Sequence, residues 1–213
     1  MPRASVLRME LCLELLEQLE ADGSVYVTSR QIGEATGVSA DKVRQDFFHL
    51  GSEGKPKVGY EVAQLAELIR SVLDLKTAKK TCLVGLGNLG RALTASNIWS
   101  RAGFELAAIF DTDPSLIGTT TAGIRVRNVT EIYGVVKAEN IIAGVAAVPA
   151  SAAQDTADLM VGAGIRAIWN FAPVKLHVPE DVVVESQSLA WGLITLSYEM
   201  KNNIKDQAPE RAK

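Results

Sequence analysis

The 213-residue sequence predicts an α/β protein: an N-terminal winged helix-turn-helix domain, then a Rossmann-type domain with a doubly wound parallel sheet. Three observations lead to this fold class. A Gly-x-Gly-x-x-Gly motif stands between an apolar strand and a helix start. Strands and helices alternate regularly after it. Two short capped helices and a glycine-rich hairpin precede it. The predicted domains are residues 1–78, 79–186 and a C-terminal dimerisation helix with a loose tail, 187–213.

The glycine motif has the sequence context of a dinucleotide-binding loop. The segment from Thr81 to Val84 is predicted to be a short buried strand, and a helix is expected from Asn88 to Ala102. Gly85 permits the tight turn, Gly87 lets a pyrophosphate approach the backbone, and Gly90 lets helix and strand pack closely. An ordinary strand-turn-helix is the alternative. The expected cofactor contacts in this loop are Gly85, Leu86, Gly87, Asn88, Leu89 and Gly90.

The next apolar strand, Phe104 to Phe110, is followed by Asp111. This acid lies about 20 residues beyond the last glycine, where a carboxylate binds the ribose hydroxyls of adenosine. No Arg or Lys follows it, since Thr112, Asp113 and Pro114 come next. A 2′-phosphate would therefore meet negative charge, and the sequence predicts NAD(H) rather than NADP(H), with Asp111 and Thr112 as contacts.

Further strands are predicted at residues 123–129, 141–148, 165–171 and 182–185. Asn128 with Glu131, and Ser151 with Gln154, are predicted to cap two of the intervening helices. Ligands in such sheets lie beyond the carboxyl ends of the strands, so the loops there should line the same pocket. In one interpretation the Asn170 amide and the Phe171 ring face the nicotinamide. In the other, Asn170 is a turn residue and Phe171 a core residue. The expected contacts from these loops are Val148, Pro149, Asn170, Phe171, Ala172 and Pro173.

The first 78 residues predict four helices and a hairpin. Helices are expected at residues 5–19, at about 40–50 and at 61–75, with a short helix opened by a Thr28–Gln31 capping box before the second. Residues 36–39 form a turn, and the glycine-rich residues 51–59 form a hairpin. Two short helices joined by a Gly-containing turn make a helix-turn-helix, and the hairpin adds a wing.

The predicted DNA-binding surface is the second helix of this motif together with the wing. Residues 1–60 contain seven Lys/Arg and nine Asp/Glu, but the cations are concentrated on that surface. Arg44 and Gln45 have the chemistry to read guanine and adenine edges. A solvated face on a small protein-interaction domain is the alternative. The predicted DNA contacts are Ser39, Lys42, Arg44, Gln45, His49, Lys55 and Lys57.

The composition is that of an ordinary globular protein, with a net charge of −3 and a pI near 5.5. Cys12 and Cys82 are expected to be small core residues, which fits a reducing cytoplasm. No signal-peptide pattern, membrane span or metal-ligand spacing occurs. The two histidines, His49 and His177, have no partner that predicts catalysis, so a nucleotide sensor is favoured over an enzyme.

The segment from Ser188 to Asn202 is predicted to be a helix that is apolar over much more than one face. It follows the last strand, where the sheet should already be covered. Such a helix needs a second partner, and we expect a homodimer in which it packs on, or swaps into, the other subunit.

The sequence resembles the bacterial redox-sensing transcriptional repressor family Rex over nearly its whole length. The resemblance rests on TGVS at 36–39, VRQD at 43–46, VGY at 58–60, VGLGNLGRAL at 84–93, FDTDP at 110–114, AVPA at 147–150 and NFAPV at 170–174. It implies a winged-helix N-terminus, an NAD(H) domain and a swapped C-terminal helix. It also implies repression of anaerobic and fermentative genes that is relieved when NADH rises. A two-fold dimer, in turn, predicts palindromic operator DNA.

Three positions depart from the pattern that this resemblance implies. A basic residue is usual where Gln45 stands, an aromatic where Glu53 stands, and an acid near Ser188. The first two bear on the operator sequence, and the third on discrimination between NADH and NAD⁺. A Rossmann reductase with a helical accessory domain is the chief alternative function. A coenzyme A-binding protein on the same fold, which should tolerate loss of Asp111, is the second.

Overall fold

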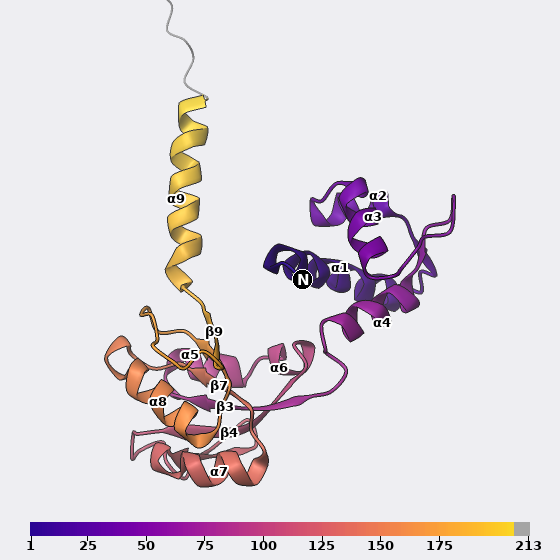
Figure 1. Ribbon diagram of the computed structural model, residues 1–213. Coiled ribbons are helices and arrows are strands. Elements are labelled where there is room, and N and C mark those ends of the chain that lie inside the picture. The colour runs from indigo at the N-terminus through magenta and orange to yellow at the C-terminus, as the bar shows by residue number, and fades with distance from the viewer. Residues whose placement is uncertain (207–213) are drawn as a thin grey trace, which may run out of the picture. The chain divides into compact units, whose positions relative to one another are not determined.

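The computed structural model describes residues 1–206, which fold as two compact units (Figure 1). The first unit is Met1–Thr77 and the second begins at Ala78. Residues 207–213, which make up most of the predicted loose tail, lie outside the described residues.

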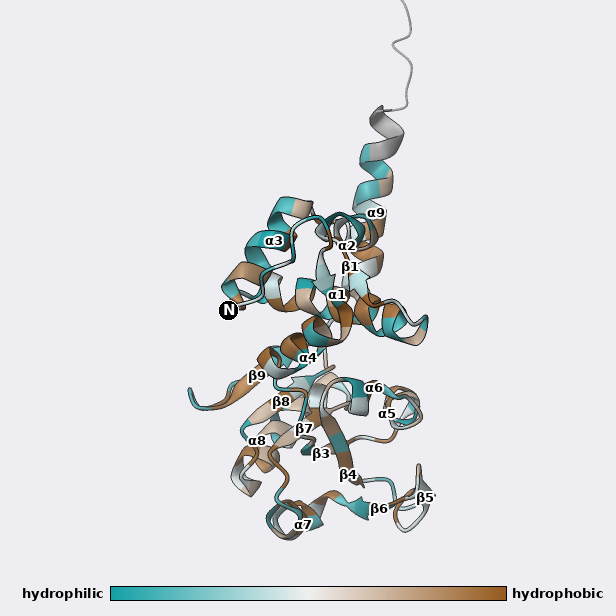
Figure 2. Ribbon diagram, turned by 90° about the vertical axis from the view of Figure 1, so that its right-hand side faces the viewer, coloured by the Kyte–Doolittle hydropathy of each residue, from teal (hydrophilic) through white to brown (hydrophobic). Residues whose placement is uncertain are grey.

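The first unit packs helices around a two-stranded antiparallel sheet. Its elements are α1 (Arg3–Ala21), β1 (Tyr26–Val27), α2 (Ser29–Thr36), α3 (Ala40–His49), β2 (Tyr60–Glu61) and α4 (Val62–Val72). Apolar residues of α1 and α4, brown in Figure 2, form much of its core. Both halves of the Thr28–Gln31 capping box form, and the Ser39 hydroxyl accepts a hydrogen bond from the Lys42 amide. The predicted helix-turn-helix is thus confirmed, although α4 ends three residues earlier than expected.

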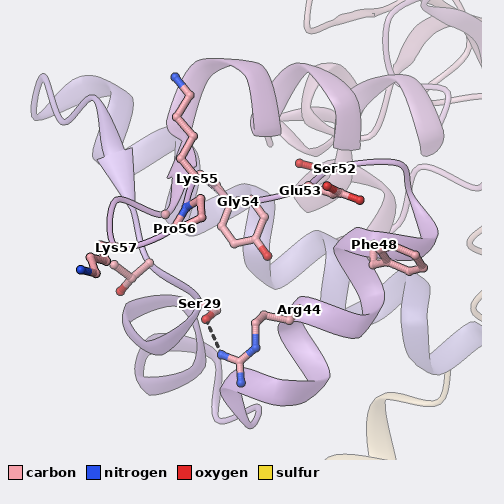
Figure 3. A pocket seen from close by; sticks show the side chains of 12 residues that line it. Ser29, Arg44, Phe48, Ser52, Glu53, Gly54, Lys55, Pro56 and Lys57 are labelled. Carbon is pink, nitrogen blue, oxygen red and sulfur yellow. Dashed lines mark hydrogen bonds between the residues drawn. The ribbon is translucent and has the colours of Figure 1, made fainter.

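The wing is a narrow loop between α3 and β2 (Figure 3). It closes through an antiparallel bridge between Lys55 and Gly59, and the Val58 amide donates to the Lys55 carbonyl at 3.1 Å. Pro56 and Lys57 occupy the central positions of this turn, with Lys57 at φ +65°. A left-handed residue after a proline is typical of a type II turn, in which glycine or asparagine is the usual occupant.

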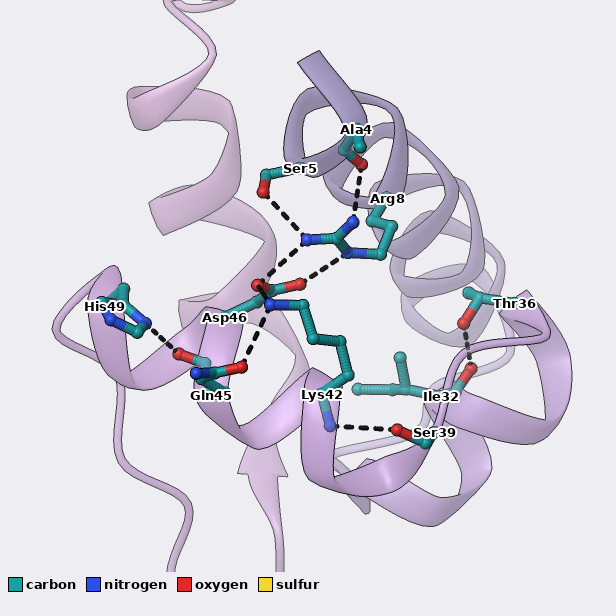
Figure 4. A network of polar contacts seen from close by, with 10 residues as sticks. All are labelled: Ala4, Ser5, Arg8, Ile32, Thr36, Ser39, Lys42, Gln45, Asp46 and His49. Atoms are coloured by element: carbon teal, nitrogen blue, oxygen red, sulfur yellow. Dashed lines mark hydrogen bonds and ion pairs between the residues drawn. The ribbon is translucent and has the colours of Figure 1, made fainter. Parts of the chain in front are cut away.

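A partly buried ion pair joins α1 to α3 (Figure 4). The Arg8 guanidinium donates from Nε and Nη2 to the two oxygens of Asp46, at 2.7 and 3.1 Å. Lys42 reaches the same carboxylate at 3.2 Å. Burial alone would raise the pKa of Asp46, but the hydrogen bonds from Arg8 and Lys42 outweigh burial and hold that pKa below its usual range. The third helix is therefore fixed to the first by charge as well as by its apolar face.

The second unit contains, within the part that the structure describes, a seven-stranded sheet. Its strands are β3 (Lys79–Val84), β4 (Phe104–Asp111), β5 (Thr120–Thr121), β6 (Ile124–Asn128), β7 (Ala143–Ala146), β8 (Ala167–Asn170) and β9 (Val183–Ser186). Their order is β5-β6-β4-β3-β7-β8-β9, and all neighbours are parallel except β5 and β6. Numbered along the chain, the six parallel strands follow the Rossmann order 3-2-1-4-5-6. The predicted doubly wound sheet is confirmed.

Helices cover both faces of this sheet. One face packs on α7 (Ile132–Glu139) and α8 (Ala153–Ala163), and the other on α5 (Asn88–Thr94) and α6 (Ile98–Arg101). Successive residues of β3 serve the two layers, since Cys82 faces the first cluster and Leu83 the second. This alternation follows from the pleat of the strand. It explains why the buried parts of the central strands, such as residues 82–84 and 108–110, are apolar on both faces.

Two predicted helices of the second unit were wrong in detail. The single helix expected over residues 88–102 is divided, because the Ser96 hydroxyl accepts from the Ile98 amide and begins α6 anew. Ser151 does not cap α8; it lies in a 3-10 turn (Ala150–Ala152), and Gln154 instead binds both backbone groups of His177. The Asn128–Glu131 capping box does form, but it opens a 3-10 turn (Val129–Glu131) ahead of α7.

The last helix, α9 (Leu189–Asp206), exposes its apolar side chains. Seven of them are more than half exposed: Leu189, Trp191, Leu193, Ile194, Leu196, Tyr198 and Met200. So much exposed apolar surface on one helix is typical of an interaction surface. None of the described helices is long and apolar enough to cross a membrane.

The substitution Asp46→Asn should lower the free energy of unfolding at pH 7 by about 1–2 kcal/mol, because it breaks a partly buried, charge-assisted contact between α1 and α3. The folded-state pKa of Asp46 is lowered, so this stabilisation is present above the unfolded-state pKa and is lost as pH falls through the folded-state value. Urea unfolding at pH 7, 5 and 3.5 should show a constant difference at the first two and a smaller one at the last.

The matched control is Glu34→Gln, which removes an exposed carboxylate paired with Arg30 at 2.8 Å. This change should cost less than about 0.5 kcal/mol at any of these pH values. Equal effects of the two substitutions would contradict a structural role for Asp46.

Candidate nucleotide site and nucleic-acid interface

The glycine loop lies where the strand order reverses, between β3 and β7. Two of its glycines are required by close backbone contacts. Gly85 has φ +95°, and a Cβ there would lie 2.5 Å from the Ala147 carbonyl oxygen. A Cβ on Gly90 would lie 2.1 Å from the Gly85 carbonyl oxygen. These glycines let the loop, the start of α5 and the end of β7 meet at one point, as the motif predicts.

Gly87 differs from both, since a Cβ there would meet no atom within 4 Å. Gly87 precedes the first residue of α5, whose first turn has no side-chain cap. Open space beside uncapped backbone amides suits an anionic group, and a pyrophosphate would occupy the position that a side chain at residue 87 would take. The loop therefore fits the group that the motif predicts.

Asp111, at the carboxyl end of β4, is hydrogen-bonded to the glycine loop. Its Oδ2 accepts from the Leu86 amide at 2.6 Å, and its Oδ1 accepts from the amides of Thr112 and Asp113 at 2.7 and 2.8 Å. A carboxylate has about four acceptor sites, so capacity remains for a hydroxyl donor. The acid that the sequence predicts for the ribose therefore also orders the loop that would hold the phosphates.

The loops after β7 and β8 complete this edge of the sheet. Val148 is half-buried and Pro149 exposed. Asn170 is fully buried and acts within the turn: its Nδ2 donates to the carbonyls of Ala172 and Val174, and its Oδ1 accepts from the Ala172 amide. These contacts favour the interpretation of Asn170 as a turn residue. Phe171 is half-buried with its ring 4.4 Å from that of Trp169, Ala172 is buried, and Pro173 is exposed.

The predicted base-reading helix, α3, presents a regular outer face. Val43 and Phe47 are buried, whereas residues 41, 44, 45, 48 and 49 are exposed. Arg44 is held in place by an ion pair with Asp41 and by the Ser29 hydroxyl, which accepts from Nη1 at 2.9 Å (Figure 3). Nδ1 of His49 donates to the Gln45 carbonyl at 2.6 Å, which leaves Nε2 unengaged by this contact.

Lys42, predicted to point outward, is only half exposed and is directed at Asp46 and Gln45 (Figure 4). The wing cations lie differently. Lys55 sits over the Tyr26 ring at 5.4 Å from its centroid, and Lys57 is exposed at the turn. Arg44, Lys55 and Lys57 line one hollow between α3 and the wing. The positive charge of this surface is therefore gathered on both sides of that hollow.

Sequence reasoning missed four residues of this surface. Arg8 and Ser29 come from other helices, and no sequence pattern near either residue predicts its contact with α3. Asp41 could have been found, because it stands three residues before Arg44 and such pairs face each other on a helix. Phe48 has no charge or hydrogen-bonding group on its side chain, and the predicted DNA contacts, all of them polar, do not include it.

The thiols of Cys12 and Cys82 belong to the hydrophobic cores of the two units. Both cysteines are buried, and burial raises the pKa of Cys12 to about 11 and that of Cys82 to about 12. Their thiols stay protonated, as core residues should. Among the described residues no group of three potential metal ligands occurs.

Two family models match the chain. One, described as "CoA binding domain", matches residues 76–174, and the other, described as "Putative DNA-binding protein N-terminus", matches residues 1–47. Relatives match nearly the whole chain. The redox-sensing transcriptional repressor Rex of Desulfitobacterium hafniense is 39% identical over 92% of this chain and 94% of its own. That of Streptomyces coelicolor is 37% identical over 97% of this chain and 80% of its own.

Solved structures agree. A crystal structure of RSP in complex with β-NAD⁺ and operator DNA matches with a TM-score of 0.89 and 34% identity, covering 100% of this chain and 99% of that one. A complex of RSP with β-NADH matches with a TM-score of 0.86 and 33% identity, covering 95% of both chains. With its helix-turn-helix unit, its glycine loop at the switch point and these full-length relatives, the chain belongs to the Rex family of redox-sensing transcriptional repressors.

Proposed function

We propose that the chain is a transcriptional repressor whose second unit binds NAD(H) and whose first unit binds operator DNA, with NADH releasing the DNA. The observation that carries this proposal is the presence in one chain of both sites: a helix-turn-helix with a cationic hollow, and a Rossmann switch point with its acid in place. The relatives named redox-sensing transcriptional repressor Rex match 92% and 97% of this chain, and so include both sites.

The adenosine end of the nucleotide would lie between the glycine loop and Asp111. A ribose hydroxyl would donate to the remaining acceptor site of the carboxylate, and the pyrophosphate would lie in the open space beside Gly87. Asp113, exposed two residues further on, adds negative charge against a 2′-phosphate. These features support NAD(H) over NADP(H), and they serve the oxidised and reduced forms equally.

Discrimination between NAD⁺ and NADH must therefore come from the nicotinamide end. We assign this end to Val148, Pro149 and the segment from Asn170 to Pro173. Asn170 would act by positioning the turn, because its side chain is buried and occupied within the protein. Phe171 and Pro173 then supply the contact surface.

A ligand shifts a conformational equilibrium only by its differential affinity for the two states. A coupling of about 1–3 kcal/mol would change DNA affinity about 5- to 150-fold.

The chain would act as a cytoplasmic homodimer. The exposed apolar residues of α9 support this assignment, since a lone helix does not leave so many large apolar side chains in water without a partner. A two-fold dimer carries two α3 helices and so implies an inverted-repeat operator. The relatives are named as repressors, which confirms the expectation that the chain is not an enzyme.

The function is tested by fluorescence anisotropy of a labelled inverted-repeat operator, selected in vitro with the purified full-length protein and titrated with NADH, NAD⁺ or coenzyme A at fixed salt. We expect release by NADH at concentrations where NAD⁺ and coenzyme A have little effect. Release by coenzyme A alone would support the second alternative. Failure to select any sequence, together with turnover of NADH by small carbonyl compounds, would support a reductase.

Substitutions of Gly87 and Gly90 distinguish effects on NADH binding from effects on the free energy of unfolding. Gly87→Ala should leave the free energy of unfolding within about 0.5 kcal/mol of wild type, because its Cβ meets nothing. It should weaken NADH binding at least about tenfold by occupying the pyrophosphate position. Gly90→Ala should cost about 1–3 kcal/mol of stability as well, because its Cβ overlaps the Gly85 carbonyl.

NADH fluorescence titration and urea unfolding measure the two effects. Gly134→Ala, on α7 with open space around it, is the control and should change neither binding nor stability unfavourably. Unchanged NADH affinity in Gly87→Ala would place the pyrophosphate elsewhere.

A further inference from the structure

The outer face of α3 contains one large apolar side chain among polar ones. Its exposed residues, Asp41, Arg44, Gln45, Phe48 and His49, follow the spacing i, i+3, i+4, i+7, i+8 and so form one stripe. Phe48 is 66% exposed, whereas the neighbouring Phe47 is fully buried. The stripe is the surface that α3 turns away from the core of its unit.

Phe48 has no place in that core. The ring contact found for it is an edge-on one with His49, whose centroid lies 6.2 Å away. A single exposed apolar residue is ordinary in itself. Phe48, however, stands one turn after Arg44 and lines the same hollow as Arg44, Lys55 and Lys57 (Figure 3). The exposed ring thus borders a hollow whose charged lining residues are three cations and one acid, Glu53.

The cations settle what kind of partner would cover the ring. A polyanion attracted by Arg44, Lys55 and Lys57 would bring its own apolar groups against Phe48. In the major groove of DNA, the 5-methyl group of thymine is the apolar feature of the base edges, and a phenylalanine side chain is one of its known contacts. The neighbouring stripe residues Arg44 and Gln45 have the chemistry to bind guanine and adenine edges.

We propose that Phe48 is a specificity-determining residue that contacts the 5-methyl group of one thymine in each operator half-site. This inference rests on the proposed DNA-binding function of the first unit. It adds a base contact that the predicted set of polar DNA-binding residues did not contain. The contribution of this contact to DNA affinity depends on one methyl group, so the contact can be tested by removing that group alone.

The experiment compares thymine with uracil, which lacks only that methyl group. An inverted repeat is first selected in vitro by the full-length wild-type protein without NADH. Each thymine is then replaced by uracil, symmetrically in both half-sites, and binding is measured by anisotropy at fixed salt. Burying one methyl group is worth about fourfold in affinity, so the sensitive position should cost about 15-fold over two half-sites.

Phe48→Ala should bind the thymine and uracil operators equally at that position, and all other positions should behave as in wild type. Phe48→Leu should keep part of the discrimination. Tyr133→Ala is the matched control, since it truncates an exposed aromatic residue on the other unit. Circular dichroism should show all three variants folded, because both side chains are exposed.

Two results would overturn the proposal. Wild-type protein that is indifferent to uracil at every position, with Phe48→Ala weaker throughout, would place the ring against the sugar-phosphate backbone. A Phe48→Ala variant that keeps the full thymine preference would assign the methyl contact to another residue. If no sequence can be selected by the wild-type protein, the DNA-binding function itself fails, and this inference fails with it.

Discussion

The second unit depends on the close approach of three backbone segments at its switch point. The Gly85 carbonyl, the first turn of α5 and the end of β7 lie so near one another that neither Gly85 nor Gly90 can carry a Cβ. This constraint sets the direction of α5 and aligns the ends of β3 and β7. It also leaves an unfilled place beside Gly87. The same packing that closes the fold therefore shapes the surface on which a phosphate group can lie.

The first unit is governed by how its charges are distributed. Asp46 forms ion pairs with both Arg8 and Lys42, and Asp41 forms one with Arg44. Part of the positive charge on α3 is therefore balanced within the protein. These acids hold the long side chains in defined directions, which reduces the entropy that they lose on binding. They also weaken non-specific attraction to phosphates, because a paired lysine or arginine releases fewer counterions. An acidic protein can thus present an ordered basic surface.

The sequence predicted the architecture well because its signals are local. Strand periodicity, the glycine motif and the Thr28–Gln31 and Asn128–Glu131 boxes each depend on neighbouring residues, and all of them form. The errors arose where side chains compete for backbone groups. Ser96 accepts from the amide of the first residue of α6 within the segment expected to be one helix, and Ser151 enters a 3-10 turn where a cap was expected. No sequence rule ranks such alternatives without the packing around them.

The candidate-site residues show the same difference between local sequence signals and contacts made by the folded chain. Gly85, Gly90 and Asp111 were found from spacing, since the fold places them together in every chain with this motif. Ser29, Arg8 and the buried role of Asn170 depend on contacts between elements, which spacing does not encode. Phe48 shows a third case. Its residue type predicts the core, and only the orientation of α3 shows that it points away from the core.

The hydrogen bond between Asp111 and the Leu86 amide has an evolutionary consequence. In the proposed function this carboxylate would select the nucleotide, and it also accepts a hydrogen bond from the glycine loop. A lineage that replaced this acid by a residue without an acceptor oxygen, in order to accept a phosphorylated ribose, would leave the Leu86 amide without its protein acceptor. A change of cofactor would therefore favour replacements that keep an acceptor oxygen for this amide, and fewer side chains meet that requirement. The preference for one nucleotide is in this way protected by the architecture.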